Sequence, residues 1–211
     1  MWNQVNTSNG IVRVLDDSVL EAYDESIKSY NSVKAKESLG KFDKSNGQLM
    51  GSNLFRLIQL ANSGLLPEGT RLARRDDLEN AISQNDSFFR GVYVDFGLAL
   101  RTAGDSYNPN DLLAKNLSEQ LEQRNIKLGR GKLIPPDSLY LVEDGNSAYG
   151  VVIDLKEEGE KLIRDINDFE WNYTRRQGLS RAILGGSKSW GSLDGDLAYS
   201  LSTGRVVVFS G

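Results

Sequence analysis

Two apolar runs joined by a short polar segment constrain the fold of this chain more than any other feature. Residues 139–142 and 149–155 are rich in Leu, Val, Ile and Tyr, and the residues between them include Asp144-Gly145-Asn146. Apolar runs that flank an Asp-Gly or Gly-Asn pair are typical of a β-hairpin. We therefore expect two antiparallel strands here, and a fold in which β-sheet has a central part.

Other segments have the spacing of further strands and helices. Gly91 to Leu100 alternates between apolar residues on one face and small or polar residues, Asp95 among them, on the other. This pattern predicts a half-buried strand with one apolar face. Apolar residues at intervals of three or four predict helices, and shorter apolar runs predict strands. The expected helices cover residues 19–33, 54–62, 76–83, 111–124 and 157–173, and the further strands cover 11–15, 70–73, 126–134, 181–184, 197–201 and 205–209.

The order of these elements predicts the fold class. Helices and strands are interspersed, and the last two strands form a second hairpin that turns at Ser202-Thr203-Gly204. Such a mixture is typical of an α+β (mixed α/β) protein. We expect a single compact domain with a central mixed β-sheet that contains two β-hairpins and is flanked by helices. Its core should include Val92, Val94, Phe96, Leu98, Val151, Ile153, Leu155, Leu162 and Ile166.

The first 48 residues differ in composition from the rest. A short strand and an amphipathic helix are followed by Lys34–Gln48, which is rich in Lys, Ser, Asn and Gly. A segment with so few large apolar residues favours an exposed and mobile loop. The sequence therefore predicts an N-terminal extension, residues 1–48, and a main α+β domain, residues 49–211.

The chain contains neither Cys nor His among its 211 residues. This excludes disulfides, thiolate nucleophiles, Ser-His-Asp catalysis and metal sites built on thiolate or imidazole. Any catalysis would have to use Asp, Glu, Lys, Arg, Tyr, Ser, Thr or a hard cation held by oxygen ligands.

The charge balance favours no particular class of partner. Lys and Arg number 25 against 29 Asp and Glu, which leaves a net charge of −4. A chain with this balance does not have the electrostatic signature of a nucleic-acid binder. The N-terminus lacks the pattern of a signal peptide, and no apolar run approaches the roughly 18 residues that span a bilayer. We expect a soluble, cytoplasmic protein that does not associate with membranes.

One motif points to metal-dependent chemistry. Pro136-Asp137, followed after sixteen residues by Asp154-Leu155-Lys156, resembles the Pro-Asp…(Asp/Glu)-x-Lys signature of the restriction-endonuclease-like superfamily. The resemblance implies that Asp137 and Asp154 hold Mg²⁺ and that Lys156, as the catalytic residue, orients or activates the attacking water.

The position of the hairpin loop determines how far apart the side chains of Asp137 and Asp154 would lie. If residues 145–146 form a two-residue loop, Asp137 lies directly opposite Asp154, with side chains about 5 Å apart. If residues 144–145 form the loop, the two become diagonal neighbours at roughly 7–8 Å. Lys156 follows Asp154 by two positions and so shares its face of the strand.

The same residues also have a structural interpretation. Asp154, followed three residues later by Glu157, has the spacing of a capping box at the start of a helix. Asp137 follows two prolines, which is common turn chemistry before a strand. The sequence leaves both interpretations open.

The C-terminal third resembles a different family. Ala182-Ile183-Leu184-Gly185-Gly186, Gly195-Asp196-Leu197-Ala198-Tyr199 and residues 202–209 look like the closing strands of the SUKH superfamily. The helical opening of that family is not evident upstream. The resemblance implies a binding protein without catalytic activity, of the kind that includes immunity proteins against bacterial toxins.

An acid-free stretch lies between Glu170 and Asp194. It carries basic residues next to aromatic ones, a combination that can hold phosphates and stack bases. The candidates for phosphate or nucleic-acid contacts are Arg175, Arg176, Arg181 and Lys188.

These observations support two hypotheses from different classes. The first is a binding protein without catalytic activity or cofactor, whose partner is another protein. The second is a Mg²⁺-dependent nuclease or phosphodiesterase that uses Asp137, Asp154 and Lys156 and has nucleic acid as its partner. The sequence leaves the choice between enzyme and binder, and the oligomeric state, open.

Overall fold

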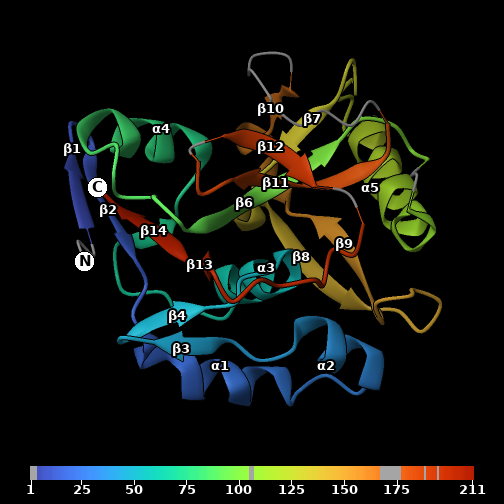
Figure 1. The fold of residues 1–211 in the computed structure, drawn as a ribbon. Helices are drawn as coiled ribbons and strands as arrows, with labels where there is room; N and C mark the ends of the chain where they lie inside the picture. Colours follow the sequence, from blue (N-terminus) through green and yellow to red (C-terminus); the bar gives the residue numbers. More distant parts are fainter. Residues whose placement is uncertain (1–3, 105–106, 167–176, 188, 194) are drawn as a thin grey trace.

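A computed structural model describes residues 4–104, 107–166, 177–187, 189–193 and 195–211. The α+β class is confirmed, because helices and mixed sheets pack into one body (Figure 1). The helices are α1 Leu20–Ile27, α2 Val33–Leu39, α3 Leu54–Asn62, α4 Arg75–Gln84 and α5 Asp111–Gln123, and the 3₁₀ turns are η1 Asp17–Val19, η2 Asn108–Asn110, η3 Pro136–Ser138 and η4 Glu157–Leu162. None of the described helices has the length and apolar character that crossing a membrane requires.

The strands form three sheets. The first has the order β1-β2-β14-β5, the second β10-β7-β6-β13-β4-β3 with β11 beside β6 and β12 beside β11, and the third is the pair β8-β9. The strands are β1 Gln4–Thr7, β2 Gly10–Val14, β3 Asp43–Ser45, β4 Gln48–Met50, β5 Thr70–Leu72, β6 Tyr93–Leu100, β7 Lys132–Ile134, β8 Leu139–Glu143, β9 Val151–Leu155, β10 Arg164–Asp165, β11 Leu179–Leu184, β12 Trp190–Leu193, β13 Gly204–Arg205 and β14 Val207–Ser210.

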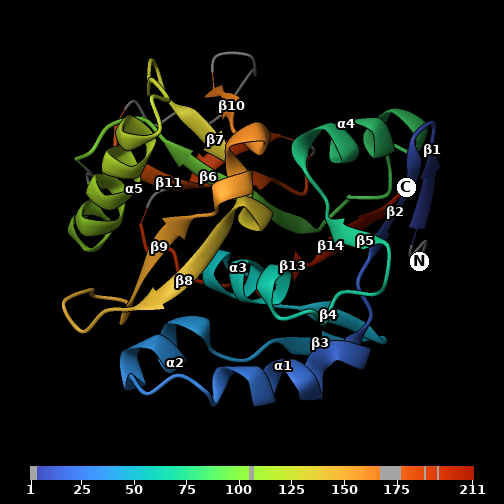
Figure 2. The ribbon, with the colours of Figure 1, turned by 180° about the vertical axis from the view of Figure 1, so that it is seen from behind.

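The N-terminal segment is part of the body of the fold. β2 pairs with β14 near the other end of the chain, so the described N-terminal residues and the C-terminus lie close together (Figures 1 and 2). Together, α1, α2 and the β3–β4 hairpin form a layer along α3. Leu39 and Phe42 belong to the same hydrophobic core as Phe55. Residues on both sides of position 48 therefore share one hydrophobic core.

The prediction of a loop across residues 34–48 is wrong. Ser32 caps α2 by accepting a hydrogen bond from the backbone N–H of Ala35, and the β3–β4 hairpin turns at Asn46-Gly47, both with positive φ. Most of the segment is exposed, yet Leu39 and Phe42 are buried. A serine N-cap is a recognised signal of a helix start, and an Asn-Gly pair is a recognised signal of a hairpin turn. The polar composition of the segment led to a loop prediction in spite of both signals.

The predicted core is confirmed. Seven of the nine expected residues are buried, and the other two, Val92 and Leu162, are partly buried. All eight residues of β6 are buried. β11 pairs with one edge and β7 and β13 with the other, and side chains of the strand pack into two hydrophobic clusters, Leu98 and Leu100 in one and Val94 and Phe96 in the other. The predicted polar face of this strand is therefore wrong.

Asp95 shows how β6 accommodates a charge. Arg181 on β11 donates to both carboxylate oxygens of Asp95 at 2.8 Å, and Ser52 and Tyr93 donate to them at 2.9 and 3.2 Å. Burial raises the pKa of the Asp95 carboxyl, and the guanidinium opposes this rise. A buried carboxylate is tolerated when it is paired and hydrogen-bonded in this way.

Two further predicted elements, the 157–173 helix and the C-terminal hairpin, differ from the structure. Residues 157–162 form the 3₁₀ turn η4, and the chain then pairs with β7 as β10, so the described part of the predicted 157–173 helix is not α-helical. Gly159 packs against Ser138, where a Cβ atom would lie 2.6 Å from the Ser138 carbonyl oxygen. Residues 197–201 form no strand, and β13 and β14 join two different sheets instead of closing a hairpin.

Candidate functional site

The β8–β9 hairpin forms as predicted but in a different register. Leu139 pairs with Leu155, and Asp154 lies opposite Tyr140. The connection covers residues 144–150 and is held by a hydrogen bond from the Asp144 N–H to the Gly150 carbonyl at 3.0 Å. Because this loop is longer than two residues, Asp137 falls outside the strands, in η3. The expected juxtaposition of Asp137 and Asp154 across the hairpin is therefore wrong.

Asp137 is bound by a guanidinium. Arg74 donates to its Oδ2 through both Nε and a terminal nitrogen, while its buried Oδ1 accepts no hydrogen bond from the described residues. Lys156 lies close enough for its charge to interact with that of Asp137. Burial lowers the pKa of Lys156, and the Asp137 carboxylate partly offsets this effect. The backbone N–H of Lys156 donates to the carbonyl of Ser138 at 2.8 Å, which places Lys156 beside the turn that carries Asp137.

Asp154 is held by amides of α5. Its Oδ1 accepts hydrogen bonds from the side chains of Asn116 at 3.1 Å and Gln120 at 2.8 Å. Within the described residues, no three Asp or Glu side chains converge into a group that could hold a metal ion. The capping-box interpretation also differs from the structure, because Lys156, and not Asp154, is the N-cap of η4.

A polar row on α5 covers the outer edge of β9. Asn116 donates to the Ile153 carbonyl at 3.1 Å, and Gln120 donates to the same carbonyl at 3.3 Å and accepts from the Leu155 N–H at 2.6 Å. Arg124 donates to the Leu155 carbonyl at 2.6 Å. These three α5 residues are spaced four apart and so share one helix face. They satisfy backbone groups that an uncovered edge strand would leave open to pairing with another chain.

The outward side of the hairpin is apolar. Tyr140 and Val142 are 40% and 38% exposed, and Val152 lies directly opposite Val142. Leu112 on α5, 39% exposed, lines a shallow groove together with Val152. We call this surface the hairpin face and define it as Leu112, Tyr140, Val142 and Val152.

Acidic groups border the hairpin face. Glu119, Asp144 and Asp154 line the same groove, with Lys115 as the basic residue among its lining. Lys115 is already paired with Glu119 at 3.9 Å. The hairpin face is thus an apolar surface with an excess of negative charge beside it.

The predicted phosphate contacts are not supported where they can be located. Arg181 is 2% exposed and bound to Asp95, so its proposed contact with a nucleic acid is wrong. Arg175, Arg176 and Lys188 lie outside the described residues. Sequence reasoning missed the polar row of α5, although the spacing of its three residues was a usable signal.

Comparison of the chain with protein-family models, with curated proteins and with solved structures returned no match. The resemblances to the restriction-endonuclease-like and SUKH superfamilies stay predictions from the sequence.

Proposed function

We propose that this protein acts by binding another protein, without catalysis, and that the hairpin face receives an apolar, basic segment of that partner. The observation that carries the proposal is the exposure of Tyr140 and Val142, two positions apart on the same strand face. Apolar side chains that gather on a surface and are bordered by polar groups are typical of interaction sites.

The composition of the hairpin face supports a protein partner. Tyrosine is enriched in the centres of protein interfaces, since its ring buries a large area while its hydroxyl keeps a hydrogen bond. The hairpin is also held firmly, because α5 covers one edge and the Asn62 side chain donates to the Leu139 carbonyl at 2.8 Å on the other strand. A rigid surface loses little conformational entropy on binding.

The charge beside the hairpin face specifies the partner's character. Asp144 and Asp154 have no basic residue bound to them in the described structure, so they would attract Lys or Arg side chains. Complementary charge raises association rates and disfavours acidic competitors.

A peptide-binding experiment tests this proposal. The probe is a synthetic peptide of alternating Leu and Lys, and its matched control alternates Leu and Glu. We expect measurable binding of the basic peptide alone, weakened about tenfold or more by the double variant Tyr140→Ser, Val142→Ser, because buried aromatic anchors dominate binding energy. Tyr199→Ser, which alters a 56% exposed tyrosine elsewhere, serves as the control variant. Equal binding by the double variant, or by the acidic peptide, would contradict the proposal.

A Mg²⁺-dependent phosphodiesterase remains the second candidate. Two observations favour it: the buried Oδ1 of Asp137 lacks a hydrogen-bond donor among the described residues, and the Lys156 N–H donates to the carbonyl of Ser138, next to Asp137. In that case Asp137 and Asp154 would hold the ion and Lys156 would act on the water. The two carboxylates would have to approach each other, because the hairpin register does not place them face to face. Asp154 would first have to leave the amides of α5.

Thermal melting with and without Mg²⁺ distinguishes the phosphodiesterase from the binding protein. A protein that binds Mg²⁺ in its folded state melts at a higher temperature when millimolar Mg²⁺ is added. A rise in the wild type that Asp154→Asn abolishes, together with nicking of plasmid DNA, would establish the enzyme. Identical melts with and without Mg²⁺, and intact plasmid, would rule it out.

A further inference from the structure

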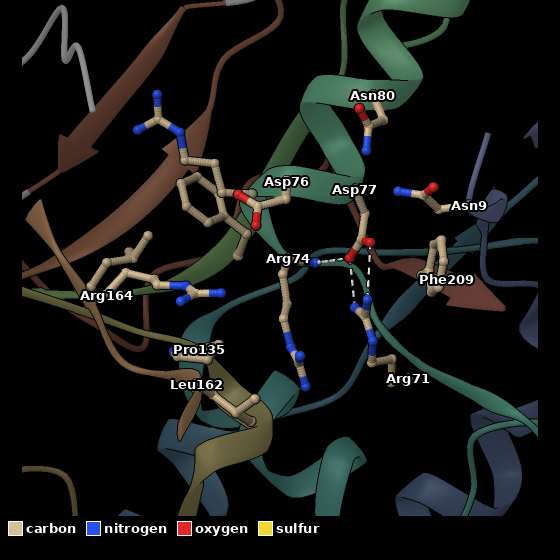
Figure 3. Close-up of a pocket in the computed structure, with 13 residues that line it drawn as sticks. Asn9, Arg71, Arg74, Asp76, Asp77, Asn80, Pro135, Leu162, Arg164 and Phe209 are labelled. Carbon is tan, nitrogen blue, oxygen red and sulfur yellow. Dashed lines mark hydrogen bonds and ion pairs between the residues drawn. The ribbon is translucent and has the colours of Figure 1, made fainter. Parts of the chain in front are cut away.

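A cavity of about 250 Å³ lies between α4 and the strands β7 and β10. Asn9 in the β1–β2 turn and Phe209 on β14 close one side, and Pro135 and Leu162 lie opposite (Figure 3). This volume is smaller than the roughly 300–1,000 Å³ of pockets that hold drug-sized ligands. The cavity shares no lining residue with the hairpin face.

Four arginines line this cavity, and three of them are engaged by carboxylates. Arg71 donates to both oxygens of Asp77, at 2.5 and 2.9 Å, and its guanidinium stacks on the ring of Phe209 at 4.5 Å. Arg74 donates to Asp137 through its side chain and to Asp77 through its backbone N–H. These bonds make the central wall of the cavity rigid.

Arg75, the third arginine engaged by a carboxylate, lies at the edge of the cavity. Arg75 donates from Nε to Glu79 at 2.8 Å, and its guanidinium lies 4.6 Å from the centroid of the Trp190 ring. Arg75 is therefore held in place by its own helix and by β12.

Among the described lining residues, Arg164 and Asp76 are the charged groups that remain available, and both are exposed to solvent. Within the part of the chain that the structure describes, the side chain of neither forms a hydrogen bond or an ion pair. Figure 3 shows Arg164 extending its guanidinium toward the middle of the cavity and Asp76 directing its carboxylate into the same space. The side-chain amides of Asn9 and Asn80 point toward each other on the opposite side.

We propose that this cavity binds a small zwitterion of the α-amino acid class with an apolar side chain. Arg164 binds the carboxylate, Asp76 binds the ammonium group, and the apolar part rests against Pro135 and Leu162. The two charged residues come from separate elements, β10 and the first turn of α4, so a ligand bridging them also ties these elements together. This site is independent of the proposed protein-binding function.

The charge balance favours a zwitterion over a phosphate or another polyanion. Among the described residues, the four lining arginines are matched by four carboxylates, those of Asp76 and Asp77 in the lining and of Asp137 and Glu79 as ion-pair partners. The formal charges around the cavity therefore cancel. A polyanion would meet the unengaged carboxylate of Asp76 as well as the guanidinium of Arg164, whereas a zwitterion satisfies both.

Isothermal titration calorimetry with L-leucine and three matched probes tests the proposal. The probe 4-methylpentanoate lacks the ammonium group, 3-methylbutylamine lacks the carboxylate, and glycine lacks the apolar side chain. We expect L-leucine to bind and each charge-deleted probe to bind at least about tenfold more weakly, because each loses a hydrogen bond between charged groups. Equal affinity for 4-methylpentanoate would overturn the assignment of Asp76, and absence of L-leucine binding would overturn the proposal.

Two variants test whether Arg164 and Asp76 bind the two charged groups of the ligand. Arg164→Gln and Asp76→Asn remove one charge each while keeping the side chains polar, and we expect each to weaken L-leucine binding at least about tenfold. Arg130→Gln and Glu21→Gln remove exposed charges outside the cavity and serve as controls, Glu21 being likewise in the first turn of a helix. Unchanged binding by either cavity variant, with folding verified by circular dichroism, would also overturn the proposal.

Discussion

The central strand β6 and the hairpin strand β9 each carry an aspartate in an alternating apolar pattern, and the two differ sharply in environment. Asp95 on β6 is 4% exposed and bound by the guanidinium of Arg181. Asp154 on β9 is partly exposed and held by the neutral amides of Asn116 and Gln120. Alternation gives each residue its face of the strand, but the elements packed on that face decide how a carboxylate is satisfied.

The difference follows from the position of each strand. β6 has partners on both edges and layers on both faces, so a carboxylate there must be neutralised by a paired cation. β9 has one strand partner and a helix at its other edge, and its outward face reaches water. Solvent on the outward face and the two amide donors together satisfy the carboxylate of Asp154 without a paired cation.

The largest expected effect tests the buried pair. Asp95→Ala leaves Arg181 buried without its carboxylate, and we expect the free energy of unfolding to fall by about 3–5 kcal/mol. Urea denaturation measures this. Asp154→Ala, the matched change on β9, should cost about 1–2 kcal/mol, because it removes hydrogen bonds from two neutral amide donors at a partly exposed site.

A double variant sharpens this result. Asp95→Ala combined with Arg181→Met removes both charges, and we expect it to be less destabilised than the sum of the two single variants. If the losses simply add, the two residues contribute independently and the contrast between β6 and β9 is not one of ion pairing.

An intermediate effect is expected at the covered edge of β9. Gln120→Ala leaves the Leu155 N–H without its hydrogen-bond acceptor and should lower the free energy of unfolding by about 1–2 kcal/mol. Hydrogen exchange of the Leu155 amide should also accelerate. Glu119→Ala, at the adjacent exposed position of the same helix, should change the stability by less than about 0.5 kcal/mol. Equal effects of the two substitutions would show that covering the edge does not stabilise the hairpin.

The smallest expected effect concerns the link between the hairpin and α2. Glu143 accepts hydrogen bonds from the backbone N–H groups of Ser32 and Asn31 at 2.6 and 2.7 Å, and these hold its pKa below the ordinary value of 4.5. A lowered pKa means that this link stabilises the fold above pH 4.5 and is lost as the pH falls through the lower pKa of the folded state.

Glu143→Gln tests this link. Since the glutamine cannot titrate, the variant should lose the part of the acid sensitivity that comes from this position, measured as protection of the Asn31 and Ser32 amides against hydrogen exchange across the acidic range. The same pH dependence in variant and wild type would assign that sensitivity to other carboxylates.

Local patterns predicted much of the fold. The helices α3, α4 and α5 and the strands of the β8–β9 hairpin lie where periodicity placed them. The loop prediction for residues 34–48 was wrong because it followed the polar composition and not the local capping and turn signals. The helix prediction for residues 157–173 was wrong where the close packing of Gly159 against Ser138 overrode the helical spacing. Of the candidate site, the sequence grouped Asp137, Asp154 and Lys156, and in the structure the backbone N–H of Lys156 donates to the carbonyl of Ser138, next to Asp137. It could not give the length of the hairpin loop, on which the position of Asp137 relative to Asp154 depends.

The sequence by itself determined which side chains share a face of each strand and helix, because that face follows from backbone periodicity alone. It also excluded every chemistry that needs Cys or His. Only the tertiary structure decided which polar side chains meet. Asp95 meets Arg181 across 86 positions of the chain, and Arg74 meets Asp137 across 63. Such partners are chosen by the pairing of distant strands and turns, and a single local pattern contains no information about that pairing.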